Sequence, residues 1–513
     1  MRRCRTAARA YCRAHTSVAT MRWVAPGGPP EALGGAVEQR PALVGGTPSA
    51  SPTSLDVTNP YSGAIVARVA RADADDVDRA CREAAEALER PDSFPAYQRA
   101  AVLDRTAALV ASRADELAWL IASEAGKPLK AAEHEVARCG DTLRFSATAA
   151  RSLGGDVVPM GASSNGAGRI GFTLRVPIGV VGAISPFNFP LTLVAHKVGP
   201  ALAAGCPVVV KPAAGAPTSA LVLGDLLVEA GLPSPWLSIL PGEGESTGAA
   251  LVDHDAPAVI SFTGSGTVGW SIRARAPQKK VLLELGSVAV MVVEPDADVN
   301  EVAAAAVSGA FTHAGQSCIP TQQIHVHERI AEAFIDRVVA LTEQLTLGDP
   351  LSLETDLGPV IDEDAATRIE RWIDEAASVG AEVVVGGGRH GTLVEPTVLV
   401  ESPADAGVNP TEVSGPVVTI HRYTDFDELL LRMSRTSTGT HAGIFTNRLD
   451  RALAAVAGLR YGGVLVNEVP TFRADQQPYG GVGGSGNTRE GPSYTVQELT
   501  EHRFVLLSGA THG

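Results

Sequence analysis

The sequence has few cysteines and few aromatic residues, and neither class is clustered. Its 513 residues include six cysteines, and aromatic residues make up 5% of the chain. The cysteines stand at positions 4, 12, 81, 139, 206 and 318, with no CxxC pair among them. This scatter excludes a disulfide scaffold and gives no reason to expect a structural zinc site or any other metal site. Reduced thiols in the cytoplasm fit this pattern best.

The sequence also lacks an excess of positive charge and long apolar runs. Its 42 lysines and arginines face 57 aspartates and glutamates, and the net charge is −15. Proteins that bind nucleic acid need a basic face, so nucleic acid is not an expected partner. No apolar run reaches the roughly 18 residues of a membrane span, so a membrane is not expected either.

The amino terminus departs from this overall composition. The first 24 residues carry arginine at positions 2, 3, 5, 9, 13 and 22 and no acidic residue. That composition is similar to a mitochondrial presequence, although no apolar core of a signal peptide is present. Two interpretations stay open: a disordered tail, with Met21 as an alternative start, or a segment that targets an organelle. Pro26 to Pro52 is rich in Pro, Gly, Ser and Ala, so residues 1–54 are predicted to be tail and linker.

Alternating strands and helices dominate the rest of the chain. Between Arg169 and Val292 short apolar segments such as IGVVGAI, PVVVKP and VLLEL alternate with helical patterns, which predicts a parallel sheet with crossover helices. A second alternating block runs from Val288 to about Asn467, so the class is α/β with two units in series. Helices are expected over residues 73–90, 97–125, 130–153, 191–204, 219–230, 302–310, 330–345 and 364–379, the first capped by Asp73.

The segment FTGSGTVG, residues 262–269, follows a predicted strand and opens a helix. It satisfies the pattern GxGxxG, and Glu284 stands where a dinucleotide fingerprint carries its ribose-binding acid. The match alone is weak, because it falls late in the block rather than at the first strand-to-helix turn. Its physical content is a helix N-terminus whose N–H groups can face a phosphate.

A second pattern centres on Cys318 in FTHAGQSCIP, where small and polar neighbours predict a loop. A single cysteine is more often a buried core residue than a nucleophile. Three polar residues in turns after apolar strands change that balance: Glu284 in LELG, Asn188 in PFNFP and Lys211 in VVVKP. A nucleophile, a base, an amide donor and a cation are the components of acyl transfer.

Seven motifs together resemble the aldehyde dehydrogenase superfamily. PFNFP, GCPVVVKPA, FTGSGTVG, LELG, GQSC, EVSGPVV and PYGGVGGSG occur in the family order between about Leu55 and about Leu507. The spacing of Glu284 and Cys318 is typical of the hydrolytic members. LELGS and PTFRADQQPYGG are most similar to the branch that contains lactaldehyde-type and phosphonate-aldehyde dehydrogenases.

The resemblance implies oxidation of an aldehyde to a carboxylic acid with NAD or NADP. Cys318 would add to the aldehyde carbon, while the Asn188 amide and the Cys318 N–H hold the oxyanion. Glu284 would activate the water that hydrolyses the resulting thioester, so it would serve water rather than a ribose. Taken alone, Glu284 could instead be a solvated carboxylate at a strand end.

The resemblance also implies a set of cofactor contacts. Lys211 would contact the adenosine ribose, Gly264 and Ser265 the pyrophosphate and Glu412 the nicotinamide ribose, with Pro186 and Phe187 also at the cofactor. Without the family context, Lys211 and Glu412 are ordinary strand-end and loop charges. Ala214 stands where strict NAD enzymes often carry a glutamate, and its small side chain removes a repulsion against a 2′-phosphate. NADP is therefore permitted, although no arginine beside Ala214 selects it.

Substrate range is the least specified property. Arg473 lies where related enzymes of acidic aldehydes carry an anion-binding arginine, and a guanidinium suits carboxylate or phosphonate. A structural salt bridge within the PTFRADQQPYGG loop is the equally weighted alternative. His313, Val288 and Ser414 depart from the common family residues, but none of these changes removes a reacting group. The expected substrate is a small aldehyde, anionic if Arg473 binds it.

The resemblance implies an aldehyde dehydrogenase fold with a Rossmann-like cofactor domain, an α/β catalytic domain and a small β oligomerisation element. The predicted boundaries are 55–150 and 174–286 for the cofactor domain, 287–487 for the catalytic domain, and 151–173 and 488–513 for the bridging element. A homodimer or homotetramer is expected. Three alternatives remain: a CoA-acylating enzyme, against which Glu284 argues, a catalytically silent protein on the same fold, and a cysteine hydrolase of esters.

Overall fold

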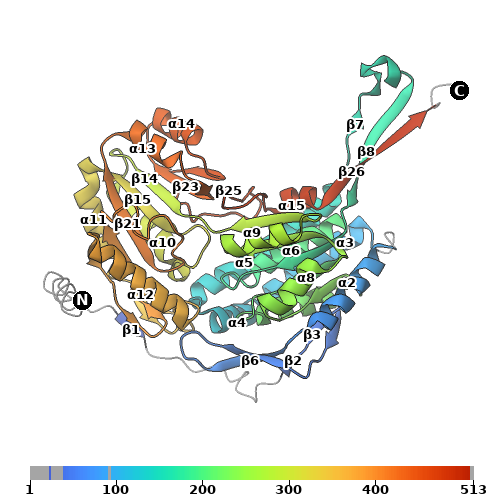
Figure 1. The fold of residues 1–513 in the computed structure, drawn as a ribbon, viewed down its shortest axis with the longest axis horizontal. Coiled ribbons are helices and arrows are strands. Elements are labelled where there is room, and N and C mark those ends of the chain that lie inside the picture. The colour runs from blue at the N-terminus through green and yellow to red at the C-terminus, as the bar shows by residue number, and fades with distance from the viewer. Residues whose placement is uncertain (1–21, 25–38, 90–93, 509–513) are drawn as a thin grey trace.

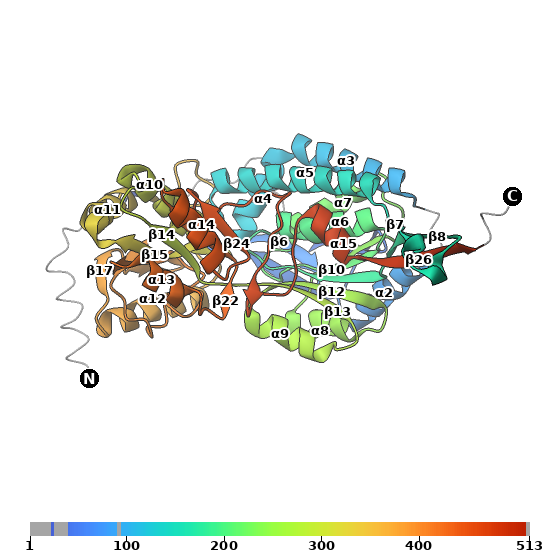
Figure 2. The same ribbon diagram turned by 90° about the horizontal axis from the view of Figure 1, so that it is seen from above.

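The computed structural model describes residues 22–24, 39–89 and 94–508, and two seven-stranded sheets lie at its centre (Figures 1 and 2). The first sheet has the order β13-β12-β9-β10-β11-β3-β4, and the second has the order β17-β20-β21-β15-β14-β23-β24. Helices cover both sheets, so the predicted α/β class is confirmed. In the described part of the chain no helix is long and apolar enough to cross a bilayer.

The strand order of the first sheet reverses at its third strand, β9. Its parallel strands are β9 (Val180–Ile184), β10 (Val208–Lys211), β11 (Leu237–Ile239), β12 (Pro257–Gly264) and β13 (Lys280–Leu285). The chain runs from β9 through α6 (Thr192–Ala204), β10 and α7 (Thr218–Glu229) to β11, and then returns to place β12 on the other side of β9. Ligands of open α/β sheets bind beside the carboxyl ends of the strands at such a reversal.

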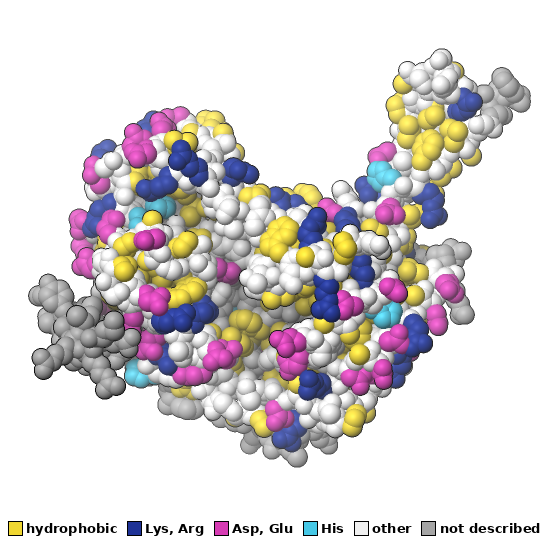
Figure 3. All heavy atoms as spheres, viewed as in Figure 1, with side chains coloured by type: hydrophobic (Ala, Val, Ile, Leu, Met, Phe, Trp, Pro, Cys, Tyr) yellow, Lys and Arg dark blue, Asp and Glu magenta, His cyan; other side chains and the backbone are white. Residues whose placement is uncertain are grey.

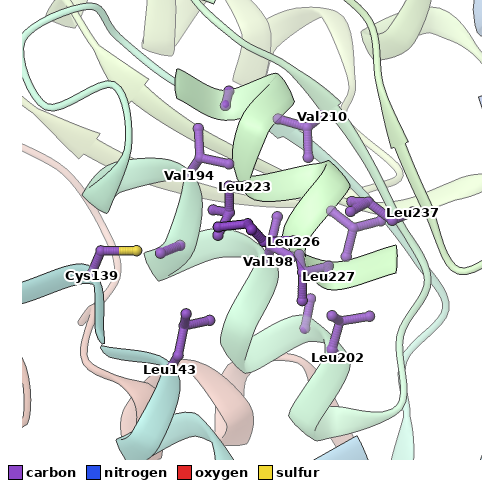
Figure 4. Packing of buried hydrophobic residues seen from close by; sticks show 14 of the residues in the cluster. Cys139, Leu143, Val194, Val198, Leu202, Val210, Leu223, Leu226, Leu227 and Leu237 are labelled. Carbon is purple, nitrogen blue, oxygen red and sulfur yellow. The ribbon is translucent and has the colours of Figure 1, made fainter. Parts of the chain in front are cut away.

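Several helices contribute side chains to the core beside this sheet. Side chains of α5 (Leu129–Ser152), α6 and α7 pack together against β10 and β11, and Figure 4 shows Leu143, Val198 and Leu226 among them. The residues of β9 and β10 are buried throughout, which explains why these strands appear in the sequence as continuous apolar runs.

The second sheet contains the carboxyl-terminal half of the chain. Its parallel strands are β14 (Ala289–Val293), β15 (Thr321–His327), β20 (Thr397–Val400), β21 (Val417–Tyr423), β23 (His441–Phe445) and β24 (Gly463–Val466), with β17 (Glu382–Val385) antiparallel at one edge. Its helices are α10 (Val299–Phe311), α11 (Glu328–Thr342), α12 (Glu363–Ser378), α13 (Phe426–Met433) and α14 (Leu449–Gly458). Only Gly286 to Val288 separate β13 from β14, so the two sheets meet at this short connection.

A three-stranded antiparallel arm projects from the body (Figure 1). It consists of β7 (Val157–Val158), β8 (Arg169–Pro177) and β26 (Thr500–Ser508), and β26 pairs with β8 along its whole length. β26 is an edge strand of this arm. The segment between β25 (Val482–Gly483) and β26 includes α15 (Pro492–Glu498), whose Val496 is buried in the core beside the first sheet. The predicted bridging element 488–513 therefore includes α15 as well as β26, and its bounds stay a prediction.

The prediction that residues 1–54 are tail and linker is wrong for the described residues 39–54. β3 (Ala42–Val44) and β4 (Thr47–Ser49) form a hairpin that pairs with β11, and β2 (Gln39–Arg40) pairs with β6 (Ile65–Ala70), which also pairs with β5 (Ser54–Thr58). Gly45 and Gly46 have φ values of 53° and 75°, which a tight turn requires. Proline and glycine there mark a sheet edge and its turn rather than a linker.

Most predicted helices are confirmed within a few residues. In α2 (Ala74–Leu88) the Asp73 carboxylate accepts the N–H groups of Asp75 and Asp76, each at 3.0 Å. The segment predicted as one helix over residues 97–125 forms two helices, α3 (Ala96–Ser112) and α4 (Ala114–Ala125). The backbone of Arg113, between them, is not helical. β1 (Arg22–Val24) pairs with β16 (Thr346–Gly348), whereas residues 1–21 and 25–38 of the predicted tail lie outside the described residues. Short elements complete the fold: α8 (Ala249–Asp253), α9 (Gly266–Arg275), β18 (Arg389–His390), β19 (Leu393–Val394), β22 (Thr438–Gly439) and β25 (Val482–Gly483).

Candidate active site

Cys318 lies in the predicted loop, between α10 and β15. After α10 the chain turns sharply, because His313, Ala314 and Gly315 have positive φ values of 50°, 53° and 67°. Left-handed backbone is unfavourable for residues with a Cβ, and such strain occurs most often at functional sites. The turn is packed tightly, since a Cβ on Gly315 would lie 2.1 Å from the carbonyl oxygen of Gly415.

The Cys318 sulfur is partly buried and has one close partner. Its Sγ lies 2.6 Å from the Tyr479 hydroxyl oxygen. Burial raises the pKa of the Cys318 thiol to about 11, the Tyr479 hydroxyl and Arg473 act to lower that pKa, and Glu412 and Glu284 act to raise it. Because the thiolate is the nucleophilic form, the site needs hydrogen-bond donors and positive charge around this sulfur.

The Asn188 side chain reaches the same loop from the other sheet. Asn188 follows β9, and its Nδ2 donates to the Gln316 carbonyl oxygen at 2.9 Å, two residues before Cys318. An amide nitrogen carries two hydrogens, so this bond leaves one for another acceptor. The start of α6 is fixed beside it, because Glu135 accepts the N–H groups of Leu191 and Thr192 at 3.0 and 3.1 Å.

Glu284 lies near the end of β13 with its carboxylate buried. Its Oε1 makes no hydrogen bond to any residue in the described ranges. A Cβ on Gly480 would lie 2.5 Å from this Oε1, so the glycine next to Tyr479 leaves room for the carboxylate. Burial and the nearby Glu490 carboxylate raise the pKa of Glu284 well above its usual value, against the opposing effects of Arg473 and Lys197. A carboxyl with a raised pKa suits general base work near neutral pH.

Arg473 lies in a buried charge cluster beside these groups. Its Nη2 donates to Glu490 Oε2 at 3.0 Å, and its guanidinium carbon lies 3.8 Å from the centroid of the Tyr479 ring. Lys197 reaches Glu490 from α6, with Nζ–Oε1 at 3.4 Å. Arg473 thus forms a salt bridge with Glu490, which lies outside the PTFRADQQPYGG loop, whereas the predicted alternative was a salt bridge within that loop. Its anion-binding role stays a prediction.

The residues predicted to bind the phosphates and the adenosine ribose gather at the carboxyl edge of the first sheet. Lys211 ends β10 and pairs in register with Ile184 of β9, while Gly264 ends β12. Ser265 caps α9 and accepts the Val268 N–H at 3.4 Å, as expected for the strand-to-helix turn of FTGSGTVG. Pro186 and Phe187 lie in the loop after β9, and Ala214 lies in the loop after β10.

Glu412 reaches this edge from the second sheet. It precedes β21, and its Oε1 accepts a hydrogen bond from Ser414 Oγ at 3.1 Å. Its Oε2 occupies the space that a side chain on Gly286 would fill, because a Cβ there would lie 1.5 Å away. Burial raises the pKa of Glu412 to about 7. The Glu412 carboxylate thus contacts Gly286, in the short connection between the two sheets.

Known proteins match almost the whole chain. The model of the aldehyde dehydrogenase family matches residues 47–505. The chain belongs to the aldehyde dehydrogenase family. The resemblance inferred from the seven motifs is confirmed, and the protein is an NAD(P)-dependent enzyme that oxidises an aldehyde to an acid.

Several relatives of this aldehyde dehydrogenase have named activities. A 3-sulfolactaldehyde dehydrogenase from Priestia aryabhattai is 40% identical over 472 residues, which cover 92% of this chain and 98% of the relative. A lactaldehyde dehydrogenase from Methanococcus maripaludis is 36% identical over 457 residues, covering 88% and 97%. The crystal structure of aldehyde dehydrogenase 21 from Physcomitrella patens, in complex with succinate, has a TM-score of 0.90 at 37% identity and covers 93% of this chain and 100% of its own.

Sequence reasoning missed several residues at the centre of this aldehyde dehydrogenase. Tyr479 and Gly480 belong to the quoted motif PYGGVGGSG, yet they received no role. Lys197 and Glu490 stand in α6 and before α15 without any motif that marks them as charged core residues. Their burial was the missing signal, because a buried charge needs a partner that the sequence does not identify.

Proposed function

We propose that Cys318 is the nucleophile of this aldehyde dehydrogenase, with Asn188 as an oxyanion donor and Glu284 as the base. The observation that carries this proposal is the convergence of the three side chains where the loop after β9, the end of β13 and the loop after α10 meet. The Cys318 sulfur adds to the aldehyde carbon, and the second Asn188 hydrogen, together with the Cys318 N–H, stabilises the oxyanion. After hydride leaves, a thioester remains on Cys318, and Glu284 takes a proton from the water that hydrolyses it.

The carboxyl edge of the first sheet fits a nicotinamide dinucleotide. When bound, NAD(P)⁺ supplies the acceptor for the hydride that leaves the aldehyde carbon. The N-terminus of α9 at Ser265 offers N–H donors to a pyrophosphate, with Gly264 before it. Lys211 and Glu412 offer a cation and an acceptor for ribose hydroxyls. The close contact of Glu412 with Gly286 fixes the carboxylate at the connection between the sheets.

We expect the enzyme to accept NADP as well as NAD. Ala214 follows Lys211 by three positions and presents no carboxylate to a 2′-phosphate. Lys211 is mostly buried, and burial lowers its pKa while Glu243 acts to raise it. A cation at this position tolerates a 2′-phosphate and also binds a ribose hydroxyl. The measured ratio of the two affinities will decide which cofactor is preferred.

The substrate we propose is a small aldehyde with an anionic group. The Arg473 guanidinium lies against the Tyr479 ring, whose hydroxyl touches Cys318, so its positive charge is close to the reacting sulfur. Related proteins are named for 3-sulfolactaldehyde and aspartate semialdehyde, and a related structure holds succinate. Each of these molecules has at least one anionic group, although aspartate semialdehyde also carries an ammonium group and the lactaldehyde of other relatives is neutral. A guanidinium near the nucleophile would favour such substrates over neutral aldehydes of equal size.

The test is reduction of NAD and NADP with a panel of lactaldehyde, succinate semialdehyde and phosphonoacetaldehyde. We expect turnover by the wild type, none by Cys318→Ala, and a loss of kcat on the order of 10²–10³ in Asn188→Ala. Glu284→Gln should give one fast equivalent of reduced cofactor per active site and then slow turnover. If Cys318→Ala kept its activity, the nucleophile would be wrong, and if turnover by the wild type required CoA, Glu284 would not be the base of a hydrolysis.

A further inference from the structure

Tyr479 is the closest polar neighbour of the proposed nucleophile and has no role in the scheme above. Its side chain is among the largest fully buried ones of the described residues. Its hydroxyl oxygen lies 2.6 Å from Cys318 Sγ, although 161 positions separate the two residues. The two atoms are within hydrogen-bonding distance of each other, and either the phenol or the thiol could donate.

The tyrosine is held on every side, so this contact is built into the fold. The Tyr479 N–H donates to the Glu490 carbonyl oxygen at 2.9 Å, and the Glu490 N–H donates back to Tyr479 at 2.6 Å. The Glu490 carboxylate in turn holds Arg473 at 3.0 Å. Arg473 lies 3.8 Å from the ring centroid, and the His441 ring lies against it at 5.0 Å between ring centroids, in an edge-on arrangement.

The direction of the hydrogen bond follows from acidity. A thiolate has no proton, so in the reactive state the only donor between these two atoms is the phenol. Burial and the neighbouring Cys318 raise the pKa of Tyr479 well above its usual value, which keeps the proton on the phenol oxygen. The hydroxyl of Tyr479 therefore donates whenever Cys318 carries a negative charge.

We propose that Tyr479 is a positioning residue that holds the Cys318 sulfur and stabilises its thiolate through the hydroxyl group. The proposal rests on Cys318 being the nucleophile. It also gives Arg473 a second task, because this guanidinium fixes the ring and places positive charge beside the sulfur. The Tyr479 hydroxyl contacts the Cys318 sulfur, the Tyr479 ring packs against Arg473, and Arg473 pairs with Glu490 in the segment after the PYGG motif.

The other charged groups around Cys318 make such a donor necessary. Glu284 and Glu412 face the sulfur from the first sheet and from the segment before β21, and both carboxylates oppose a negative charge on it. Arg473 and the Tyr479 hydroxyl are the groups that oppose this effect. Removing the hydroxyl leaves Arg473 as the remaining protein group that favours the thiolate among those named here.

The decisive measurement is the pH profile of Cys318 alkylation by iodoacetamide in the full-length protein, followed by mass spectrometry of the Cys318 peptide. Below the thiol pKa the rate is proportional to the thiolate fraction. Tyr479→Phe should lower the rate at pH 8 by about ten-fold to one-hundred-fold, as expected for loss of a hydrogen bond to a charged group. Tyr97→Phe, on the exposed surface of α3, is the matched control and should leave the profile unchanged.

A second variant keeps the test decisive if Tyr479→Phe does not fold. Site-specific replacement of Tyr479 by 3-fluorotyrosine keeps the ring and the hydroxyl but makes the phenol a stronger donor, so alkylation at pH 8 should become faster. A profile of Tyr479→Phe that superposes on the wild type, or a slower reaction of the fluorinated protein, overturns the proposal. Retained dehydrogenase activity in Cys318→Ala would instead refute the nucleophile, and the alkylation profile would still report on Tyr479.

Discussion

At two positions of the site, Gly480 and Gly286, a carboxylate oxygen lies where a side chain would begin. A Cβ on Gly480 would lie 2.5 Å from Glu284, and a Cβ on Gly286 would lie 1.5 Å from Glu412. Real Cβ atoms do not approach oxygen this closely, so a side chain at Gly286 must move the Glu412 carboxylate. A side chain at Gly480 must move Glu284 and also the Thr488 backbone, whose carbonyl oxygen would lie 2.2 Å from the Cβ. Glycine is required here for space, since neither residue has a left-handed backbone.

Gly286→Ala should therefore weaken cofactor binding by displacing Glu412. We expect the Kd for NAD and for NADP to rise by about ten-fold, as for loss of a hydrogen bond to a charged group. Isothermal titration calorimetry measures both constants directly. Gly161→Ala is the control, because no heavy atom lies within 4 Å of its added Cβ and it lies in the projecting arm. An unchanged Kd in Gly286→Ala would mean that Glu412 does not contact the cofactor.

At the scale of elements, α5 holds the start of α6 and with it the loop of Asn188. Glu135 of α5 accepts two N–H groups at the start of α6 and pairs with Lys127, and both charged side chains are almost completely buried. The pair connects the helix core to the loop that carries the amide donor. A buried ion pair is costly to break, because the remaining charge has no water around it.

Glu135→Ala should lower the free energy of unfolding by about 3–5 kcal/mol, because it leaves the Lys127 ammonium buried without its carboxylate. Urea denaturation followed by tryptophan fluorescence measures this loss, and kcat should fall with it as the Asn188 loop loosens. Glu116→Ala breaks the more exposed Arg113–Glu116 pair and should cost less than about 1 kcal/mol. Equal losses in the two variants would contradict a special role for the buried pair.

Elements with a strong periodic pattern could be predicted from the sequence, and elements marked mainly by composition could not. α2 has a capping aspartate and a helical apolar face, and the buried strands β9 and β10 are continuous apolar runs. β3 and β4 are short and surrounded by Pro and Gly, so their composition predicted a linker. Their pairing with β11 depends on a strand almost 200 residues away, and a local pattern contains no information about such a partner.

The same limit applies to the active site. Cys318, Glu284 and Asn188 could be named because each stands in a short motif with a recognisable order. The contact of Tyr479 with Cys318 and the ion pair of Arg473 with Glu490 join different motifs, so they depend on the tertiary fold. The sequence therefore allowed a role to be predicted for single residues. It did not allow prediction of the contacts that shift the pKa of each of these groups.

The whole molecule has one feature that a single chain does not explain. The arm of β7, β8 and β26 exposes apolar side chains on both of its faces, and Figure 3 shows part of this apolar surface at the end of the projection. Phe504 and Leu506 lie on one face of β26, whereas Leu507 lies on the other and is paired with Ile170 of β8. A three-stranded sheet with uncovered apolar faces and a free edge strand is a typical site for association with another chain.

We expect this arm to join copies of the chain into a homodimer or homotetramer. The double change Phe504→Asp and Leu506→Asp introduces charge on the apolar face without altering the body of the enzyme. Light scattering after size exclusion should then give a mass near the 53.0 kDa of one chain, instead of a multiple of it. Leu449→Asp with Leu453→Asp, on the exposed face of α14, is the matched control and should leave the mass unchanged. A wild type that is already monomeric, or an arm variant that keeps the larger mass, would show that the apolar faces of the arm do not hold the assembly together.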